Sequence, residues 1–189
     1  MLLNNRCFCG SNEKFSTCCQ PFINREVNQE TSQQTLPKTA EQLMRSRFSA
    51  YVTGNGQYIY DTYAKSSQAS QSVEEINDWS KACVWIALLI RSINNGNTTN
   101  TDSSEQFVEF SAFYITDNTL CELRENSRFV LENCETNARH NLQWRYIDGD
   151  IIEHSELTDI KRKDLCPCNN YSTAWSMKKG KKFKQCCGK

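Results

Sequence analysis

Residues 107–131 read FVEFSAFYITDNTLCELRENSRFVL, and this stretch decides the fold. Its first part, Phe107–Thr116, is rich in β-branched and aromatic residues, which favour extended strands. Asp117-Asn118 is a turn signal, because Asp and Asn tolerate the backbone angles that tight turns need. Leu120–Leu131 is predicted as the next strand. The stretch therefore predicts two consecutive strands of an antiparallel sheet.

Two further strands are predicted on either side of this pair. Lys81–Ile93 contains an apolar run, Val84–Ile90, that suits a strand buried on both faces. A loop rich in Gly, Asn, Thr and Ser follows at 94–104. Leu142–Asp148 is predicted as the last strand, after a polar link at Glu132–Asn141. The four strands together predict an antiparallel meander.

Helices are predicted before the strands. Thr39-Ala40-Glu41-Gln42 has the pattern of a capping box, apolar residues then recur at helical spacing, and Gly54 stands where a C-cap glycine belongs. A shorter helix is predicted around Gln57–Lys65, and a third helical turn near Val73–Asn77. Helices followed by an antiparallel meander indicate an α+β fold. The polar stretch 24–37 in front of them is predicted as a linker.

Two cysteine clusters lie at the two ends of the chain. The first has the pattern Cys-x-Cys, eight residues, Cys-Cys, and the second has Cys-x-Cys, seventeen residues, Cys-Cys. Four thiolates suit tetrahedral Zn²⁺, and segments this short need a metal to fold. We expect two structural zinc ions, although four thiolates also suit iron and the alternative is buried free thiols. The predicted ligands are Cys7, Cys9, Cys18, Cys19, Cys166, Cys168, Cys186 and Cys187.

Composition and charge narrow the class of protein. The eleven cysteines are an odd number, and the short polar start is no signal peptide, so a disulfide framework is not expected. No apolar stretch approaches the roughly 20 residues of a membrane span. We therefore expect a cytoplasmic protein. The net charge is zero, but residues 157–189 hold nine Lys/Arg against two Asp/Glu. This basic tail indicates an acidic partner, with a merely solvated tail as the alternative.

The cysteine clusters resemble a known zinc module. Cys166-Pro167-Cys168, followed by Gly180-Lys181-Lys182-Phe183 and Cys186-Cys187, is similar to the SEC-C motif, which also occurs at the C-terminus of the SecA translocation ATPase. The resemblance implies zinc binding by the four cysteines of each copy. The family spacing is eight residues, so nine extra residues, Tyr171–Lys179, are predicted to form an outward loop in the second copy. Its Tyr171, Trp175 and Met177 side chains either form a contact surface or pack back on the body.

The middle of the chain resembles the YchJ-like domain. The resemblance implies a nuclear transport factor 2-like fold, in which helices and a curved antiparallel sheet form a cone. It divides the chain into an N-terminal SEC-C motif at 1–23, a linker at 24–37, a middle domain at 38–156 and a C-terminal SEC-C motif at 157–189. Arg124 stands where the family usually has histidine. The matching segments are Leu43–Tyr51, Trp79, Val108-Glu109-Phe110, Glu125–Phe129 and Trp144–Gly149.

A cone of this kind often holds a pocket in its concave face. Alternation along the third strand puts Glu125 and Ser127 on one face with Leu123, Phe129 and Leu131. These polar groups indicate a ligand site or general base, with Arg47 as the expected partner of Glu125; the alternative is a structural network.

The remaining candidates are predicted to be structural: Trp79, Trp85 and Trp144 as core, Cys83, Cys121 and Cys134 as inert thiols, and His140 and His154 without a motif.

These features support three hypotheses about function. The first is a non-enzymatic adaptor that contacts a protein or ribosomal partner through its SEC-C motifs, near translation or protein export. The second is a small-molecule binder or enzyme that uses the cone pocket. The third is direct RNA binding through the basic tail, with an affinity that falls steeply with salt. We favour the adaptor, because the sequence contains no phosphate loop and no catalytic triad signature.

Overall fold

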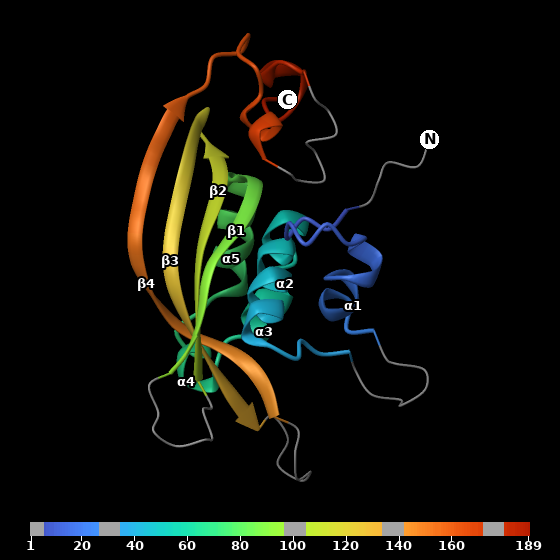
Figure 1. The fold of residues 1–189 in the computed structure, drawn as a ribbon, viewed down its shortest axis with the longest axis vertical. Coiled ribbons are helices and arrows are strands. Elements are labelled where there is room, and N and C mark those ends of the chain that lie inside the picture. The colour runs from blue at the N-terminus through green and yellow to red at the C-terminus, as the bar shows by residue number, and fades with distance from the viewer. Residues whose placement is uncertain (1–5, 27–34, 97–104, 134–141, 172–179) are drawn as a thin grey trace.

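The computed structural model describes residues 6–26, 35–96, 105–133, 142–171 and 180–189. Four strands form one antiparallel sheet in the order β1-β2-β3-β4, and α2 and α5 lie against one of its faces (Figure 1). The predicted α+β meander with a curved sheet is confirmed. The strands are β1 Val84–Asn95, β2 Glu105–Thr116, β3 Thr119–Asn133 and β4 Leu142–Asp159.

The central hairpin of β2 and β3 has an uninterrupted register from Glu105↔Val130 to Thr116↔Thr119. Asp117 and Asn118 connect the strands with φ angles of 48° and 64°. Two consecutive residues with positive φ are characteristic of the two-residue turn that matches the twist of a hairpin. The turn signal in the sequence is therefore confirmed.

Bulges bend the sheet around the helices. The pairing of β4 with β3 skips one β4 residue at three places, leaving Ile147, Ile152 and Leu157 without a partner in the register. The pairing of β1 with β2 likewise skips Ile86 and Arg91. Each inserted residue bends its strand and increases the local twist. Bulges on both outer strands thus give the sheet its curvature.

Strand β4 is longer than predicted. It was expected to end at Asp148, but it pairs with β3 up to Asp159. The continuation is almost entirely exposed and carries several acidic residues, so it lacks the buried-face alternation by which a strand is recognised. Pairing with β3, rather than burial of side chains, holds this half of the strand in place.

Helix α2, Ala40–Thr53, begins and ends where the sequence predicts. The Thr39 hydroxyl accepts a hydrogen bond from the Gln42 amide at 3.1 Å, and Gly54 ends the helix with φ 70°. The Gln42 side chain accepts from the Lys38 amide at 2.8 Å, so the reciprocal bond forms one residue before the cap.

The shorter helices differ from their predicted bounds. The element expected over Gln57–Lys65 consists of α3, Gly56–Asp61, and α4, Lys65–Gln68. The intervening backbone pairs with β4 instead, since the Tyr146 amide donates to Thr62 O at 2.9 Å. Helix α5, Val73–Ala82, begins at the predicted residue, where the Ser72 hydroxyl caps it, and extends beyond the turn predicted near Val73–Asn77. Helix α1 is Gln20–Ile23.

The main core lies between α2 and the concave face of the sheet. Its largest fully buried side chains include Phe48, Leu43, Val108 and Phe129. The alternate residues of β3 point to the other face, where ion pairs join β3 to β1, β2 and β4. Their nitrogen–oxygen distances are 2.9 Å for Arg91–Glu122, 2.5 Å for Arg124–Glu109 and 2.6 Å for Arg128–Asp148. Within the described residues, no helix has the length and apolar character needed to cross a membrane.

Replacing Phe129 by Ala is expected to lower the free energy of unfolding by about 3–5 kcal/mol, because the change leaves a cavity in the core. Phe129 is fully buried, and its ring packs edge-on against Tyr146 at a centroid distance of 5.7 Å. Urea denaturation of the metal-loaded protein measures the change. Leu142→Ala is the control, because Leu142 is 56% exposed and should lose only about 0.5 kcal/mol or less.

Candidate metal centres and the cone cavity

The four N-terminal cysteines converge on one point. The Sγ atoms of Cys7, Cys9, Cys18 and Cys19 all lie within 4.8 Å of one another. The Cys9–Cys18 and Cys18–Cys19 Sγ distances are 3.7 Å and 3.8 Å. Four sulfurs about 2.3 Å from a tetrahedral zinc ion lie about 3.8 Å apart, whereas a disulfide brings its sulfurs to about 2.05 Å. The spacing fits four ligands of one metal ion.

The four C-terminal cysteines have the same arrangement. The Sγ atoms of Cys166, Cys168, Cys186 and Cys187 also lie within 4.8 Å of one another. The Cys168–Cys186 and Cys186–Cys187 Sγ distances are 3.5 Å and 3.8 Å. All eight predicted ligands are therefore brought together in two groups of four. None of the ten cysteines in the described part of the chain forms a disulfide.

The two clusters share a backbone architecture as well as a ligand pattern. An isolated β-bridge closes each loop between the two cysteine pairs, Arg6–Lys14 in the first copy and Leu165–Lys182 in the second. The longer C-terminal loop keeps this closure, although residues 172–179 of the predicted insertion lie outside the described residues. A short 3-10 helix precedes each Cys-Cys pair: Phe15–Thr17 and Phe183–Gln185.

Hydroxyl groups surround the N-terminal thiols. The Ser11 hydroxyl lies 3.3 Å from Cys18 Sγ, and the Ser49 hydroxyl of α2 lies 3.7 Å from Cys7 Sγ. Hydrogen bonds from Cys19 and Ser11 lower the pKa of the Cys18 thiol to about 7, against the opposing effect of burial. The thiolate is the form that binds a metal. Hydroxyl donors near the sulfurs also orient ligands and tune a metal site.

The N-terminal cluster is part of the fold rather than an appendage. The Arg45 guanidinium of α2 donates a 2.7 Å hydrogen bond to the Cys9 carbonyl, and Phe8 packs against the main core. Gly10 approaches β1 so closely that an added Cβ would lie 3.3 Å from the Leu88 carbonyl oxygen. Its φ of 77° also favours glycine. The cluster therefore contacts both α2 and the edge of the sheet.

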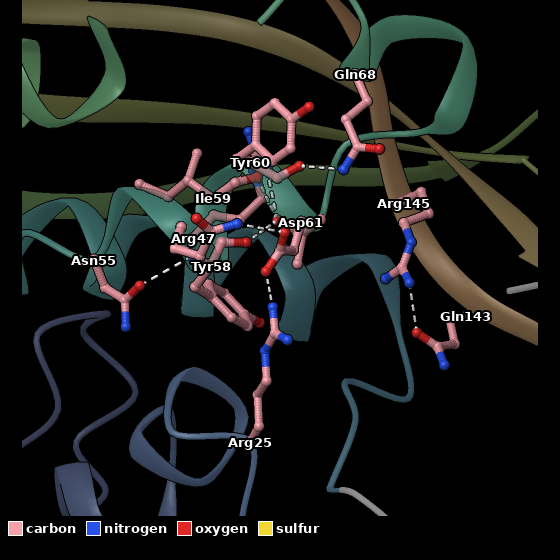
Figure 2. Close-up of polar contacts among 12 residues, drawn as sticks. Arg25, Arg47, Asn55, Tyr58, Ile59, Tyr60, Asp61, Gln68, Gln143 and Arg145 are labelled. Atoms are coloured by element: carbon pink, nitrogen blue, oxygen red, sulfur yellow. Dashed lines mark hydrogen bonds and ion pairs between the residues drawn. The ribbon is translucent and has the colours of Figure 1, made fainter. Parts of the chain in front are cut away.

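Polar contacts join the segment after the N-terminal cluster to the body (Figure 2). Arg25 forms an ion pair with Asp61 of α3, and Arg145 of β4 donates to the Gln143 side chain at 2.6 Å. These groups line a cavity of about 270 Å³ that also contacts Phe22. The Arg25–Asp61 ion pair attaches the segment after the N-terminal cluster to α3, whereas the Arg145–Gln143 hydrogen bond lies within β4.

The C-terminal cluster packs on a second apolar group at one end of the sheet. Phe183 is buried there with Phe113 and Ile115, which alternate with core residues of β2 and so point away from α2. Tyr171, at the start of the predicted insertion, stacks on Phe113 with a centroid distance of 4.7 Å. This residue therefore packs back on the body instead of extending outward.

A cavity of about 190 Å³ lies in the concave face of the cone. Arg47, Glu125 and Ser127 all line it, together with Leu123, so the structure brings the three candidate pocket residues together. Ser127 and Tyr146 donate hydrogen bonds to Glu125 Oε1, at 2.5 Å and 3.0 Å. The polar network that was the alternative to a ligand site is thus present, and it leaves space beside it.

Arg47 does not pair with Glu125, and this expectation was wrong. Its Nη1 atom donates instead to the Ile59 carbonyl at 2.8 Å and to the Thr62 hydroxyl at 2.7 Å. Arg47 is only 4% exposed, and a buried guanidinium is stable only where its N–H groups have acceptors. The end of α3 supplies those acceptors, which the sequence pattern could not show.

The predicted core roles of the tryptophans hold in part. Trp85 and Trp144 are buried, but Trp79 is 39% exposed and lines the cavity. Trp79 lies on α5, where it packs edge-on against Trp85 at 4.9 Å. Cys83 and Cys121 are buried as expected, and His154 contacts the Tyr114 hydroxyl at 2.5 Å. Cys134 and His140 lie outside the described residues.

The residues that reach these sites from elsewhere in the fold gave little or no signal in the sequence. Arg45 and Ser49 lie one helical turn apart, which gave a weak signal that they share a face of α2. Tyr63, Trp79 and Tyr146 line the cavity from three different elements. Only the tertiary structure brings such residues together.

Comparison with known proteins places the chain in a family. A family model described as the YchJ middle, NTF2-like domain matches residues 39–149, and a SEC-C motif model matches residues 4–21. The chain belongs to the YchJ family. A UPF0225 protein of Vibrio cholerae is 36% identical over 183 residues, covering 96% of this chain and 99% of the relative. A UPF0225 protein of Serratia proteamaculans is 33% identical over 185 residues, covering 97% of each.

Two solved structures share the fold of this YchJ-family chain. The crystal structure of a SEC-C motif containing protein from Psychrobacter arcticus has a TM-score of 0.65 and 26% identity, and covers 100% of this chain and 98% of that chain. The solution structure of a SEC-C motif containing protein from Rhodopseudomonas palustris has a TM-score of 0.61 and 21% identity. It covers 78% of this chain and 98% of that chain, and supports the fold alone.

Replacing Arg45 by Ala is expected to loosen the N-terminal cluster, because a hydrogen bond from a charged donor stabilises by about 1.5–3 kcal/mol. The Cys7 amide, which donates to the Glu13 carbonyl at 2.7 Å, should then exchange its hydrogen faster. Hydrogen exchange followed by mass spectrometry measures this. Arg6→Ala is the control, since the Arg6 side chain donates to Asn12 within the same segment. Equal effects of the two substitutions would contradict docking through Arg45.

Proposed function

We propose that this protein is a non-enzymatic adaptor that holds two structural zinc ions, one in each four-cysteine cluster. The observation that carries the metal sites is the spacing of the sulfurs, 3.5–3.8 Å for the neighbouring pairs. Four thiolates complete the coordination of zinc and leave no position for a substrate or water, which is characteristic of structural sites. Free thiols also persist best in a reducing compartment, which supports a cytoplasmic location.

The C-terminal cluster is the part that we propose contacts the partner. Seven basic residues within the described part of this module are exposed, and Leu165 beside them is 57% exposed. The metal organises these side chains on a small rigid unit, which suits recognition of an acidic surface on a protein or the ribosome. A role near translation or protein export follows from the same proposal. The basic residues are Lys161, Arg162, Lys163, Lys181, Lys182, Lys184 and Lys189.

A second candidate function is binding of a small molecule in the cone cavity. The observation that favours it is the remaining space of about 190 Å³ beside Glu125, in a hollow otherwise lined mostly by aromatic and aliphatic side chains. Pockets of this composition, with a few polar groups that converge, are typical ligand sites. This function is compatible with the adaptor, because the cavity and the C-terminal cluster lie in different parts of the fold.

Purified protein is expected to contain about two zinc ions per chain, and Cys9→Ser and Cys168→Ser are each expected to reduce the content to about one, because a structural site needs all four ligands. Elemental analysis by mass spectrometry after gel filtration measures this. Cys83→Ser is the matched control, because Cys83 is buried outside both clusters and should leave the content unchanged. Full metal content in Cys9→Ser would exclude the N-terminal site.

Reversing charges on the C-terminal cluster is expected to weaken partner binding. The double variant Lys181→Glu, Lys182→Glu should reduce co-sedimentation with ribosomes, or capture of an acidic protein, by about tenfold or more, since each contact with phosphate or carboxylate is lost. Lys14→Glu is the matched control, because Lys14 occupies in the first copy the bridge position of Lys182. RNase treatment and a salt titration separate RNA from protein partners. Equal binding by all three proteins would exclude this surface.

A further inference from the structure

The Glu125 carboxylate has one oxygen that the protein does not use. Oε1 accepts hydrogen bonds from Ser127 at 2.5 Å and from Tyr146 at 3.0 Å. Among the described residues, none donates a hydrogen bond to Oε2, and no Lys, Arg or His forms an ion pair with Glu125. The two donors fix the orientation of the carboxylate, because the Ser127 side chain is fully buried. Glu125 therefore presents an oriented acceptor in the wall of the cavity.

The nearest candidate counter-ion, Arg47, is engaged elsewhere. Its guanidinium carbon lies 4.5 Å and 4.7 Å from the ring centroids of Tyr63 and Tyr146, in addition to the two hydrogen bonds to the end of α3. Tyr146 contacts both charges, with its ring toward Arg47 and its hydroxyl toward Glu125. The tyrosine thus lies between the two groups, and no Lys, Arg or His in the described part of the chain pairs directly with the carboxylate.

The strand opposite Glu125 makes room for the carboxylate. Gly149 of β4 pairs with Ser127, and a Cβ on this glycine would overlap the Glu125 carboxylate. Any side chain at position 149 would therefore force Glu125 to move. The glycine thus leaves room beside β4 for the carboxylate of Glu125, a residue that lines the cavity.

Aromatic rings line the same cavity, among them Tyr51, Trp79 and Trp85. Trp79 packs edge-on against Trp85 at 4.9 Å and against Tyr51 at 5.2 Å. The faces of such rings carry negative potential and attract cations. Burial raises the pKa of Tyr51 to about 12, so its hydroxyl stays neutral at physiological pH and adds no second anion. The cavity thus combines apolar rings with two opposite charges, the Glu125 carboxylate and the Arg47 guanidinium, and the guanidinium donates to Ile59 and Thr62.

We propose that the cone cavity binds a small organic ammonium ion, whose N–H group donates to Glu125 Oε2 while its flat or apolar body packs on Trp79 and Trp85. This inference rests on the second candidate function, which assigns the cavity to a small molecule. The volume of about 190 Å³ lies below the usual 300–1,000 Å³ of pockets for drug-sized ligands. The ligand is therefore an amine with a single ring or a short chain.

The test uses three probes of similar shape and different charge: phenethylamine, 2-phenylethanol and 3-phenylpropionate. Titration calorimetry and tryptophan fluorescence of the full, zinc-loaded chain measure binding. The amine is expected to bind at least about tenfold more tightly than the alcohol, because its ammonium group adds an opposite charge to the hydrogen bond with the carboxylate; a tenfold difference corresponds to about 1.4 kcal/mol. The carboxylate probe should bind most weakly, because Glu125 repels it.

Two substitutions assign the preference to Glu125. Glu125→Gln should weaken amine binding by about tenfold or more and leave alcohol binding within about twofold, because only the charge is lost. Gly149→Ala displaces the carboxylate without removing its charge, and should also abolish the preference. Glu122→Gln is the matched control, since Glu122 pairs with Arg91 on the other face of the sheet. Thermal unfolding of each variant confirms that it folds.

Three outcomes would overturn the inference, and they differ in meaning. Equal binding of amine and alcohol by the unmodified protein would refute the ammonium class and keep the cavity as a ligand site. Tighter binding of 3-phenylpropionate would do the same and point to Arg47 as the recognition group. Absence of binding by all three probes at about 10 mM, an affinity weaker than about 2.7 kcal/mol, would refute both the ammonium class and the small-molecule function of the cavity.

Discussion

Burial of helix α2 on more than one side is the constraint on which the rest of the structure depends. Its apolar residues, Leu43 and Phe48 among them, fill the concave side of the sheet. Its polar residues are also buried and must find partners: Ser46 with the Tyr58 hydroxyl at 2.7 Å, Arg47 with the end of α3, and Ser49 with a cluster thiol. A buried polar group without a partner costs about 1–3 kcal/mol, so the end of α3 must dock beside Arg47. Ser46 and Ser49 also donate to carbonyl groups of α2 itself.

Much of the fold follows from local signals in the sequence. The turn at Asp117-Asn118, the Thr39 cap and Gly54 each act through the backbone of neighbouring residues, and each was predicted correctly. The far half of β4 gave no such signal, because its residues are exposed and only pairing with β3 keeps them extended. Local chemistry thus determines where elements begin and turn, whereas an exposed strand depends on its neighbour.

The metal clusters and the cavity show the same difference between local and long-range signals. Each cysteine cluster is encoded within a short segment or two, so spacing alone identified the groups that converge. The cavity is assembled from six elements, and its character depends on contacts such as those of Arg47 with Ile59 and Thr62. Strand alternation placed Glu125 and Ser127 in the cavity correctly. It could not show that Trp79 would join them, since a tryptophan in an amphipathic helix usually indicates core.

The bulges of β4 also bear on the solubility of the protein. An edge strand of 18 residues is a template on which other chains could add as further strands, leading to aggregation. The unpaired residues Ile147, Ile152 and Leu157 interrupt the regular spacing of its backbone groups, and acidic side chains lie between them. Between these interruptions, each stretch of regularly spaced backbone hydrogen-bonding groups on the edge is short. The bulges that curve the sheet thereby also protect its exposed edge strand, β4, from pairing with other chains.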